Sequence, residues 1–318
     1  MEIVNRPLGM SIIVCNFNAK LESILLTLSS CIYQEGVDFE IIYTDDASKN
    51  SYKDEITNFF KRHNFPNYKL VCHSSNQGTL KNLIDGIKEA QYTYVKCIGA
   101  GDLFYDNSSL KKAMNVFAFN SSDVVIAKSV YFFDDGKQIK EFDLSNPIDS
   151  SPYKRGNQKK IQKRLVMNQD VILGASIFAR RDYLYELYTK FVGKVKYTED
   201  SLIVYASAMG ARVAYLDKYA VMYEYSTGIS TSSKSQFQKI IADETESVYE
   251  TIKAESSDKR IQKYLRIRQK VRSTKGKVSG MIKKFFLTPS QIKIKYKSKT
   301  LKKEKADFSF YLKCKEEK

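Results

Sequence analysis

YVKCIGAGD, residues 94–102, is the stretch that decides which fold to expect. Its first five residues are mostly apolar and precede turn-forming residues, which is typical of a short buried strand. Gly99, Ala100 and Gly101 let the backbone turn tightly, and Asp102 then stands at the carboxyl end of the strand. Ligands of open α/β sheets bind at that edge. A carboxylate there suits a divalent cation carrying a diphosphate, since Mg²⁺ is usually held by one or two carboxylates and by phosphates. The alternative is an ordinary turn after a strand.

Strand-like and helix-like stretches alternate along the first third of the chain. Apolar runs typical of buried strands occupy residues 10–15, 39–44, 68–72 and 94–98, and helical spacing occupies residues 19–34, 52–62 and 79–90. Short connections between such elements predict parallel strands, right-handed crossovers and helices on both faces. Neither GxGxxG nor GxxxxGK[ST] occurs, so the usual dinucleotide and P-loop sites are not expected.

Polar residues follow the first two of these strands. Asn16 and Asn18 come after the first strand, and Asp45 and Asp46 come after the second. The paired carboxylates could accept hydrogen bonds from a nucleobase or a ribose, as an acidic residue does in dinucleotide folds. They could equally cap the helix that follows them. From this pair alone both alternatives stay open.

The second half of the chain has a different pattern. Further strands are predicted for residues 123–133, 172–179, 211–216 and 219–225, and residues 134–157 are predicted to be loop-like. A mobile basic loop that could contact an acceptor is predicted from Tyr153, Lys154, Arg155, Lys159 and Lys160. Thr198, Glu199 and Asp200 precede an apolar helical stretch, so Thr198 reads as an N-cap with acids in the first turn. The alternative makes one acid a general base, a group that typically contributes ~10²–10⁴-fold to a rate.

Composition argues against several classes of protein. An apolar fraction of 43% is enough for a core, and no stretch approaches the ~20 apolar residues that cross a bilayer. The N-terminal residues have no apolar run of the signal-peptide type, so we expect a cytoplasmic protein. Five widely spaced cysteines, no CxxC pair and two histidines argue against a disulfide framework, a structural zinc site and a Cys–His nucleophile.

The positive charge is concentrated near the C-terminus. Residues 257–305 hold 18 lysines and arginines against two acidic residues, so this segment accounts for the whole net charge of +16. Within it, residues 277–287 carry an apolar stripe with Lys283 and Lys284 beside it, the pattern of an interfacial anchor on an anionic membrane. A helix packed on the body and a nucleic-acid-binding tail are the alternatives. Residues 291–299 alternate like an edge strand.

Five stretches, in this order, resemble motifs of the family 2 glycosyltransferases, which are nucleotide-sugar-dependent enzymes with an A-type fold. They are SIIVCNFN (residues 11–18), DDAS (45–48), NQGTLKNLIDGIKEA (76–90), GAGD (99–102) and TED (198–200). They are similar, in turn, to that family's opening strand, nucleoside-binding acidic turn, Asn-x-Gly stretch, metal motif and catalytic-base motif. YEYSTGISTS (residues 223–232) is similar to a loop of polysaccharide-building members, so the resemblance covers about residues 10–233.

This resemblance implies a fold, a domain organisation and an activity. We expect an α/β, Rossmann-like nucleotide-diphospho-sugar transferase fold, with a mixed central sheet flanked by helices. Residues 1–233 would form the catalytic domain, and residues 234–318 a helical, lysine-rich extension. The implied activity is inverting transfer of a hexose or N-acetylhexosamine from a nucleotide-diphosphate donor, with a UDP-sugar favoured. The implied acceptor is a lipid-linked oligosaccharide of surface polysaccharide synthesis, at the inner face of the cell membrane.

The resemblance also implies roles for individual residues. Asp200, with Glu199 beside it, would deprotonate the acceptor hydroxyl, and Asp102 would bind Mg²⁺ or Mn²⁺ on the diphosphate. The expected donor contacts are Cys15, Phe17, Asn18, Asp45, Asp46, Asn76, Gly78, Asn82 and Gly101, with Phe17 stacked on the base. One departure matters, because the family often has two or three acids in the metal motif. Here Gly99 and Gly101 stand where the others would be, which predicts a weaker metal affinity or a different ribose contact.

Two other functions stay open. A nucleotidyltransferase of related fold would want a glycine- and lysine-rich loop after the first strand, where this chain has NFNAK (residues 16–20). A non-catalytic module that binds nucleotides or nucleic acid would keep ligand binding without catalysis. Because the basic residues lie in the tail, nucleic acid is not the partner that we expect for the main site.

Overall fold

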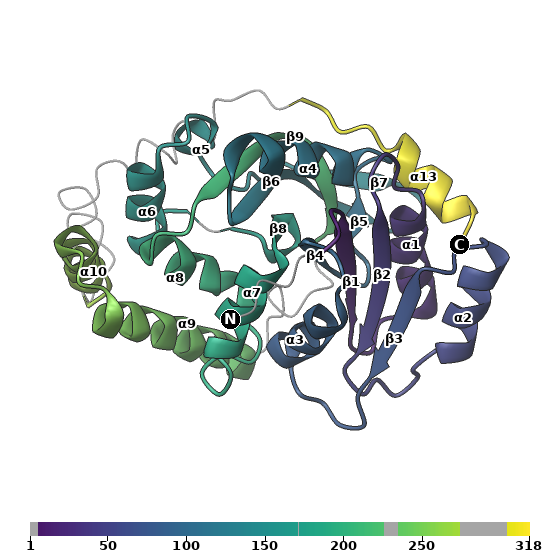
Figure 1. Cartoon of the computed structure of the whole chain (residues 1–318), viewed down its shortest axis with the longest axis horizontal. Helices are drawn as coiled ribbons and strands as arrows, with labels where there is room; N and C mark the ends of the chain where they lie inside the picture. The colour runs from purple at the N-terminus through teal and green to yellow at the C-terminus, as the bar shows by residue number, and fades with distance from the viewer. Residues whose placement is uncertain (1–5, 171, 226–234, 274–303) are drawn as a thin grey trace.

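Strand β4 (Tyr94–Gly99), which leads into the GAGD turn, lies in the middle of a mixed sheet (Figure 1). The computed structural model describes residues 6–170, 172–225, 235–273 and 304–318. Across these residues nine strands form the order β3-β2-β1-β4-β8-β6-β9-β5, with β7 paired to β6. The mixed central sheet expected from the sequence is therefore confirmed.

The first four strands are parallel, as the alternating pattern predicts. They are β1 (Met10–Asn16), β2 (Phe39–Asp45), β3 (Tyr68–Cys72) and β4. Strand β8 (Ile177–Arg180) is antiparallel to β4 and to β6 (Val124–Asp134), and β9 (Val213–Glu224) is parallel to β6. The two short strands β5 (Leu103–Phe104) and β7 (Ile139–Phe142) are antiparallel to β9 and β6. Because β9 pairs with β5 just after the GAGD turn, its end lies beside that turn.

Side chains of the sheet alternate between two cores on opposite faces. In β1, Ile12 and Val14 share a core with α1 (Leu21–Ile32), α2 (Lys53–Arg62) and α4 (Ser109–Asn120). Ile13 shares the other core with α3 (Thr79–Glu89) and α7 (Arg181–Lys190). Helix α3 packs so closely that a Cβ added at Gly86 would lie 2.6 Å from the Ile13 side chain. This contact sets the height of α3, and hence of its N-terminus, against the sheet.

Helices after residue 234 pack on the body at two separate places. Helices α9 (Ser235–Glu255) and α10 (Lys259–Arg272) lie against α8 (Leu202–Ala208) and α6 (Gln158–Val166), whereas α13 (Ser309–Glu316) lies beside α1 (Figure 1). Among the described helices, none is both long enough and apolar enough to cross a membrane. The helix and edge strand predicted for residues 277–287 and 291–299 lie outside the described residues. The domain boundary at residue 233 stays a prediction.

Three local predictions for the second half are wrong. Residues 134–157 are not a mobile loop, because they contain β7 and α5 (Ser151–Lys154), and the buried Tyr153 donates a hydrogen bond of 3.2 Å to Asp170. The strand predicted for residues 172–179 begins only at Ile177, after the 3-10 turn η1 (Gly174–Ser176). The two strands predicted within residues 211–225 are the single strand β9, because an irregular pairing with β6 near Lys128 accommodates the polar break.

Candidate active site

Asp45 links the turn after β2 to the turn after β1. Its carboxylate accepts hydrogen bonds from Asn16 Nδ2 at 2.7 Å, from the Ser48 N–H at 3.0 Å and from the Ser48 hydroxyl at 2.5 Å. The Asn18 N–H in turn donates to Ser48 Oγ at 2.7 Å. Helix α2 begins later, at Lys53, and has no side-chain cap. The helix-capping alternative is therefore wrong for this residue, which instead fixes two loops at the carboxyl edge of the sheet.

Asp46 fixes the turn that leads into α3. Its two carboxylate oxygens accept the N–H groups of Gln77 at 2.7 Å and Gly78 at 2.8 Å, and His73 Nδ1 lies 3.1 Å from the carboxylate. Gly78 has φ +90°, a conformation that side-chain-bearing residues rarely adopt. Asn76 Nδ2 lies 3.4 Å from the Asp46 carbonyl oxygen. The DDAS and NQG stretches are thus one hydrogen-bonded unit.

Asn82 and Cys15 meet below this edge. Asn82 Nδ2 donates to the Cys15 sulfur at 3.2 Å, and Asn82 is fully buried. Burial raises the pKa of the Cys15 thiol to about 12, so the thiol stays protonated. Phe17 differs from its neighbours, because its side chain is 49% exposed at the rim. The predicted donor residues near β1, β2 and α3 therefore gather at one edge, with an aromatic ring open to solvent.

Asp102 lies where β4 passes into β5. Its Oδ1 accepts the N–H of Glu224, the last residue of β9, at 3.1 Å. A Cβ added at Gly99 would lie 3.4 Å from its Oδ2, so glycine leaves room for the carboxylate. Burial raises the pKa of Asp102 to about 7, against the lowering effect of this hydrogen bond and of Lys96. Titratable groups with such strongly shifted pKa values are typical of functional sites.

Glu224 brings a second carboxylate to the GAGD turn. Gly101 has φ +109°, and a Cβ added there would lie 3.1 Å from Glu224 Oε2. The side chain of Glu224 thus occupies space that an acid at position 101 would need. No pattern in the sequence indicates this neighbour, because its position depends on the pairing of β5 with β9. A carboxylate from a distant strand thus lies beside the turn in which the family often has further acids.

Glu199 and Asp200 lie in a 3-10 turn, η2, directly before α8. Burial raises the pKa of both carboxyl groups, and for Glu199 the neighbouring charge of Asp200 raises it further. The charge of Glu199 contributes to the raised pKa of Cys15, whereas that of Asp200 contributes to the raised pKa of Tyr131. Both acids lie beside Gly174, where an added Cβ would be 3.3 Å from Asp200 Cβ and 3.5 Å from Glu199 Oε1.

Glu244 of α9 holds the TED segment in place. Its Oε2 accepts hydrogen bonds from the N–H groups of Tyr197 and Thr198 and from the Thr198 hydroxyl, each at 3.0 Å. The sequence predicted that Thr198 caps α8, and this prediction is wrong because its side chain makes no capping hydrogen bond. Glu244 lies in the predicted C-terminal extension, and no motif in the sequence indicates that it contacts the site.

Tyr131 of β6 is influenced by both acidic motifs. Burial raises the pKa of its phenol, and Tyr223, Asp200, Tyr225 and Asp102 raise it further. Asp102 and Asp200 are thus both within electrostatic reach of one hydroxyl group. The charges of the predicted metal ligand and of the predicted base thus both raise the pKa of a tyrosine that the sequence did not single out.

The residues at this edge fit a divalent cation that shares its ligands with a diphosphate. Asp102 and Glu224 supply two carboxylates, and Mg²⁺ usually takes one or two, with substrate phosphates completing its shell. Within the described parts of the chain, no group of three or more histidine, cysteine, aspartate or glutamate side chains could hold a metal by itself. A metal bound here would therefore need the phosphate oxygens of a donor.

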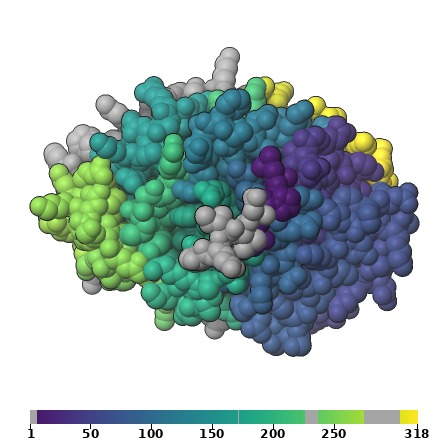
Figure 2. Space-filling view, viewed as in Figure 1, coloured from purple at the N-terminus to yellow at the C-terminus, as the bar shows by residue number. Residues whose placement is uncertain are grey.

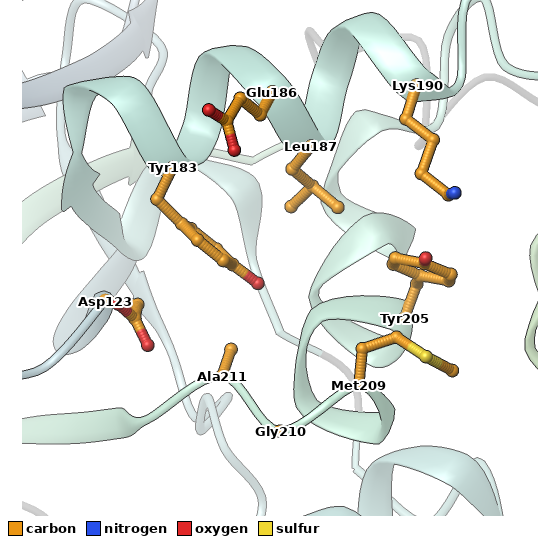
Figure 3. A pocket seen from close by; sticks show the side chains of 9 residues that line it. All are labelled: Asp123, Tyr183, Glu186, Leu187, Lys190, Tyr205, Met209, Gly210 and Ala211. Carbon is orange, nitrogen blue, oxygen red and sulfur yellow. The ribbon is translucent and has the colours of Figure 1, made fainter. Parts of the chain in front are cut away.

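A separate pocket lies between α7 and α8, away from this edge. Figure 3 shows Tyr183, Glu186 and Lys190 of α7 around it, with Tyr205 of α8. None of the predicted site residues lines it. Lys190 already pairs with Glu255 at 3.0 Å, so the cation at its rim is satisfied within the protein.

Comparison with protein families gives the class of this chain. The family model described as Glycosyl transferase family 2 matches residues 11–188, which is more than half of the chain. The chain therefore belongs to glycosyl transferase family 2, as the motifs implied.

Two curated relatives share part of the sequence. An uncharacterized glycosyltransferase of Haemophilus influenzae is 31% identical over 175 residues, which are 54% of this chain and 66% of that protein. A poly-beta-1,6-N-acetyl-D-glucosamine synthase of Staphylococcus epidermidis is 34% identical over 100 residues, which are 31% of this chain and 23% of the synthase. The chain thus spans about two thirds of the first relative and about a quarter of the second.

Solved structures of S. aureus TarS share the fold. TarS 1-349 in complex with UDP-GlcNAc aligns with a TM-score of 0.57 at 17% identity, covering 90% of this chain and 81% of that one. The complex of TarS 1-349 with UDP gives a TM-score of 0.54 over 81% of this chain and 70% of that one, also at 17% identity. At this identity the likeness concerns the fold alone, which is the A-type glycosyltransferase fold.

The raised pKa of Asp102 predicts a pH-dependent effect on stability. Its folded-state pKa of about 7 lies above the ordinary value of 3.8, so the stability it contributes is present below pH 3.8 and is lost as pH rises through 7. Without divalent cations at pH 8, the free energy of unfolding of Asp102→Asn should therefore exceed that of wild type by on the order of 2 kcal/mol, as measured by urea denaturation. At pH 5 this difference should be smaller. Asp243→Asn, an exposed position on α9, is the matched control. Equal free energies of unfolding of Asp102→Asn and wild type at pH 8 would contradict the raised pKa of Asp102.

Proposed function

We propose that this chain is an inverting transferase that moves a sugar from a nucleotide-diphosphate donor, with a UDP-sugar favoured. The observation that carries the proposal is the placement of Asp102, which accepts the Glu224 N–H, beside the edge where the predicted donor residues gather, with the charges of both Asp102 and Asp200 raising the pKa of Tyr131. A glycosyl transfer needs a group that holds the leaving diphosphate and a group that activates the acceptor. These two carboxylates, on separate elements, can fill those roles.

The roles follow from the surroundings of each acid. Ionised Asp200 removes the proton from the acceptor hydroxyl while the hydroxyl oxygen attacks the anomeric carbon, on the side opposite to the leaving diphosphate. The configuration at that carbon is therefore inverted. Asp102, with Glu224 beside it, would hold Mg²⁺ or Mn²⁺, and such an ion supplies Lewis-acid stabilisation of the leaving diphosphate when bound. Phe17 offers an exposed ring for the base at the carboxyl end of β1.

The donor and acceptor classes are supported by the relatives. A structural neighbour, TarS, is titled as a complex with UDP-GlcNAc, and a sequence relative is named a poly-beta-1,6-N-acetyl-D-glucosamine synthase. We infer that this chain uses a UDP-hexose or UDP-N-acetylhexosamine and extends a lipid-linked oligosaccharide of a surface polysaccharide. A nucleotidyltransferase is less well supported, because the loop after β1 is tied to Ser48 through Asn16 and Asn18 and has no glycine-rich character.

Replacement of Asp200, the proposed base, distinguishes a transferase from a non-catalytic binding module. Asp200→Asn should lower hydrolysis of the UDP-sugar by ~10²–10⁴-fold, because water can no longer be deprotonated, while the affinity for UDP stays within a factor of about two. Hydrolysis is followed by released UDP, and affinity by calorimetry. The matched control is Asp243→Asn, whose carboxylate is exposed on α9. Wild-type protein that binds UDP but hydrolyses none of the UDP-, GDP-, CMP- and dTDP-sugars would favour the non-catalytic module.

We further propose that the protein works at the inner, cytoplasmic face of the cell membrane as a peripheral protein. Figure 2 shows α10 at one end of the molecule. Its exposed cations are Lys259, Arg260, Lys263, Arg266, Lys270 and Arg272. Each cation near an anionic surface contributes about 1 kcal/mol. Together with the apolar stripe that the sequence predicts for residues 277–287, this helix would bring the site close to a lipid-linked acceptor.

Vesicle binding tests this location. The protein should sediment with vesicles that contain phosphatidylglycerol and stay in solution with pure phosphatidylcholine. The triple variant Lys259→Gln, Lys263→Gln and Arg266→Gln should bind the anionic vesicles at least about tenfold more weakly, because three surface cations are lost. The control replaces the exposed Lys20, Lys49 and Lys88, which lie outside α10, with glutamine. Unchanged binding of the α10 variant, or binding to duplex RNA in place of vesicles, would overturn the membrane assignment.

A further inference from the structure

Three aromatic residues form a row across the sheet. In the strand pairing, Tyr131 of β6 lies opposite Phe142 of β7 on one side and opposite Tyr223 of β9 on the other. Residues that face each other across paired strands project from the same face of a sheet. Tyr225, two residues after Tyr223, completes what we call the aromatic row, consisting of Phe142, Tyr131, Tyr223 and Tyr225. Its rings are in contact, with centroids 5.5 Å apart for Tyr131–Tyr223, 6.4 Å for Tyr131–Tyr225 and 4.8 Å for Phe142–Tyr225.

The aromatic row is on the face of the sheet that α13 does not cover. Phe132, the next residue along β6, is buried on the other face, with its ring 6.0 Å from Phe308 and 5.1 Å from Tyr311. By contrast, all four members of the aromatic row are partly exposed. Four neighbouring aromatic side chains are therefore partly accessible to solvent on this face.

The aromatic row leads to Asp102 of the candidate site. Leu103 lies opposite Met222 in the antiparallel pairing of β5 with β9, so one step along the same register places Asp102 opposite Tyr223. The hydrogen bond from the Glu224 N–H to Asp102 supports this placement. At the middle of the row, the charges of Asp200 and Asp102 both act on the Tyr131 hydroxyl. The donor edge of β1 and β2 lies on the other side of β4.

We propose that the aromatic row binds a sugar ring of the acceptor, beside the GAGD turn. The C–H faces of a pyranose pack well on aromatic rings, while its hydroxyl groups need polar partners nearby. Three of the four members are tyrosines, which supply a ring and a hydroxyl together, and the Asp102 carboxylate accepts the N–H of Glu224, the residue between Tyr223 and Tyr225. A lipid chain would need an aliphatic surface instead. The assignment of this sugar as the acceptor rests on the proposed transferase function.

The absence of tryptophan from the chain makes a direct test possible. Phe142→Trp places a single tryptophan in the aromatic row, and its emission can be followed while methyl glycosides of glucose, galactose, N-acetylglucosamine and N-acetylgalactosamine are added. We expect a saturable change with at least one of these sugars. Adding Tyr131→Ala should raise the dissociation constant at least about tenfold, whereas adding Tyr131→Phe, which keeps the ring, should change it much less. Phe119→Trp, at an 87% exposed position on α4, should not respond.

Each outcome of this experiment has a clear meaning. No saturable change from Phe142→Trp with any sugar, or the same response after Tyr131→Ala as after Tyr131→Phe, would overturn the proposal. An equal response from Phe119→Trp would also overturn it, because the effect would then not come from the aromatic row. UDP-sugar hydrolysis by wild type is measured in parallel. Sugar binding at the row without any hydrolysis would keep the sugar site and remove the transferase, so the two failures can be told apart.

Discussion

The hydrogen bond from the Glu224 N–H to the Asp102 carboxylate joins the two parts of the sheet on which the site depends. The parallel strands β3, β2, β1 and β4 end at the edge where open α/β sheets bind ligands. Strand β9 belongs to the other part, together with β6 and β7. Because β9 ends against Asp102, the donor edge and the aromatic row share one border. The carboxylate at that border can therefore serve a donor on one side while an acceptor lies on the other.

The carboxylates around this border fall into two groups, those that accept several backbone N–H groups and those whose pKa is raised by burial. Asp46 and Glu244 each accept two backbone N–H groups, and they fix the turn before α3 and the TED segment. Hydrogen bonds of this kind compensate for the loss of water around a buried charge. For Asp102, Glu199 and Asp200, burial instead raises the pKa of the carboxyl group. A carboxylate with a raised pKa is a better proton acceptor, which suits the role that we propose for Asp200. A bound cation would stabilise the ionised form of such a group, which suits the role that we propose for Asp102.

Much of the fold could be predicted from the sequence, because strands such as β1 and helices such as α3 carry strong local periodicity. The residues around DDAS, NQG and GAGD were found by the same reasoning, since each follows a recognisable strand. Glu224, Glu244 and Tyr131 could not be found, because their neighbours are set by strand register and helix packing. The prediction for the region around Tyr153 is wrong, since Pro152 and Gly156 are typical of loops although two short helices, α5 and α6, occupy this region.

The most direct test of the account is donor binding measured by thermal unfolding of wild type and Asp102→Ala. UDP-glucose, UDP-N-acetylglucosamine, GDP-mannose and a dTDP-sugar are compared with and without Mn²⁺. A donor at 100 times its dissociation constant should stabilise the protein by about 2.7 kcal/mol. The account predicts that one donor class, a UDP-sugar, raises the unfolding temperature only with Mn²⁺, and that Asp102→Ala removes this increase. No increase with any donor, or an equal increase in Asp102→Ala, would contradict the central claim that this edge holds a metal-bound nucleotide sugar.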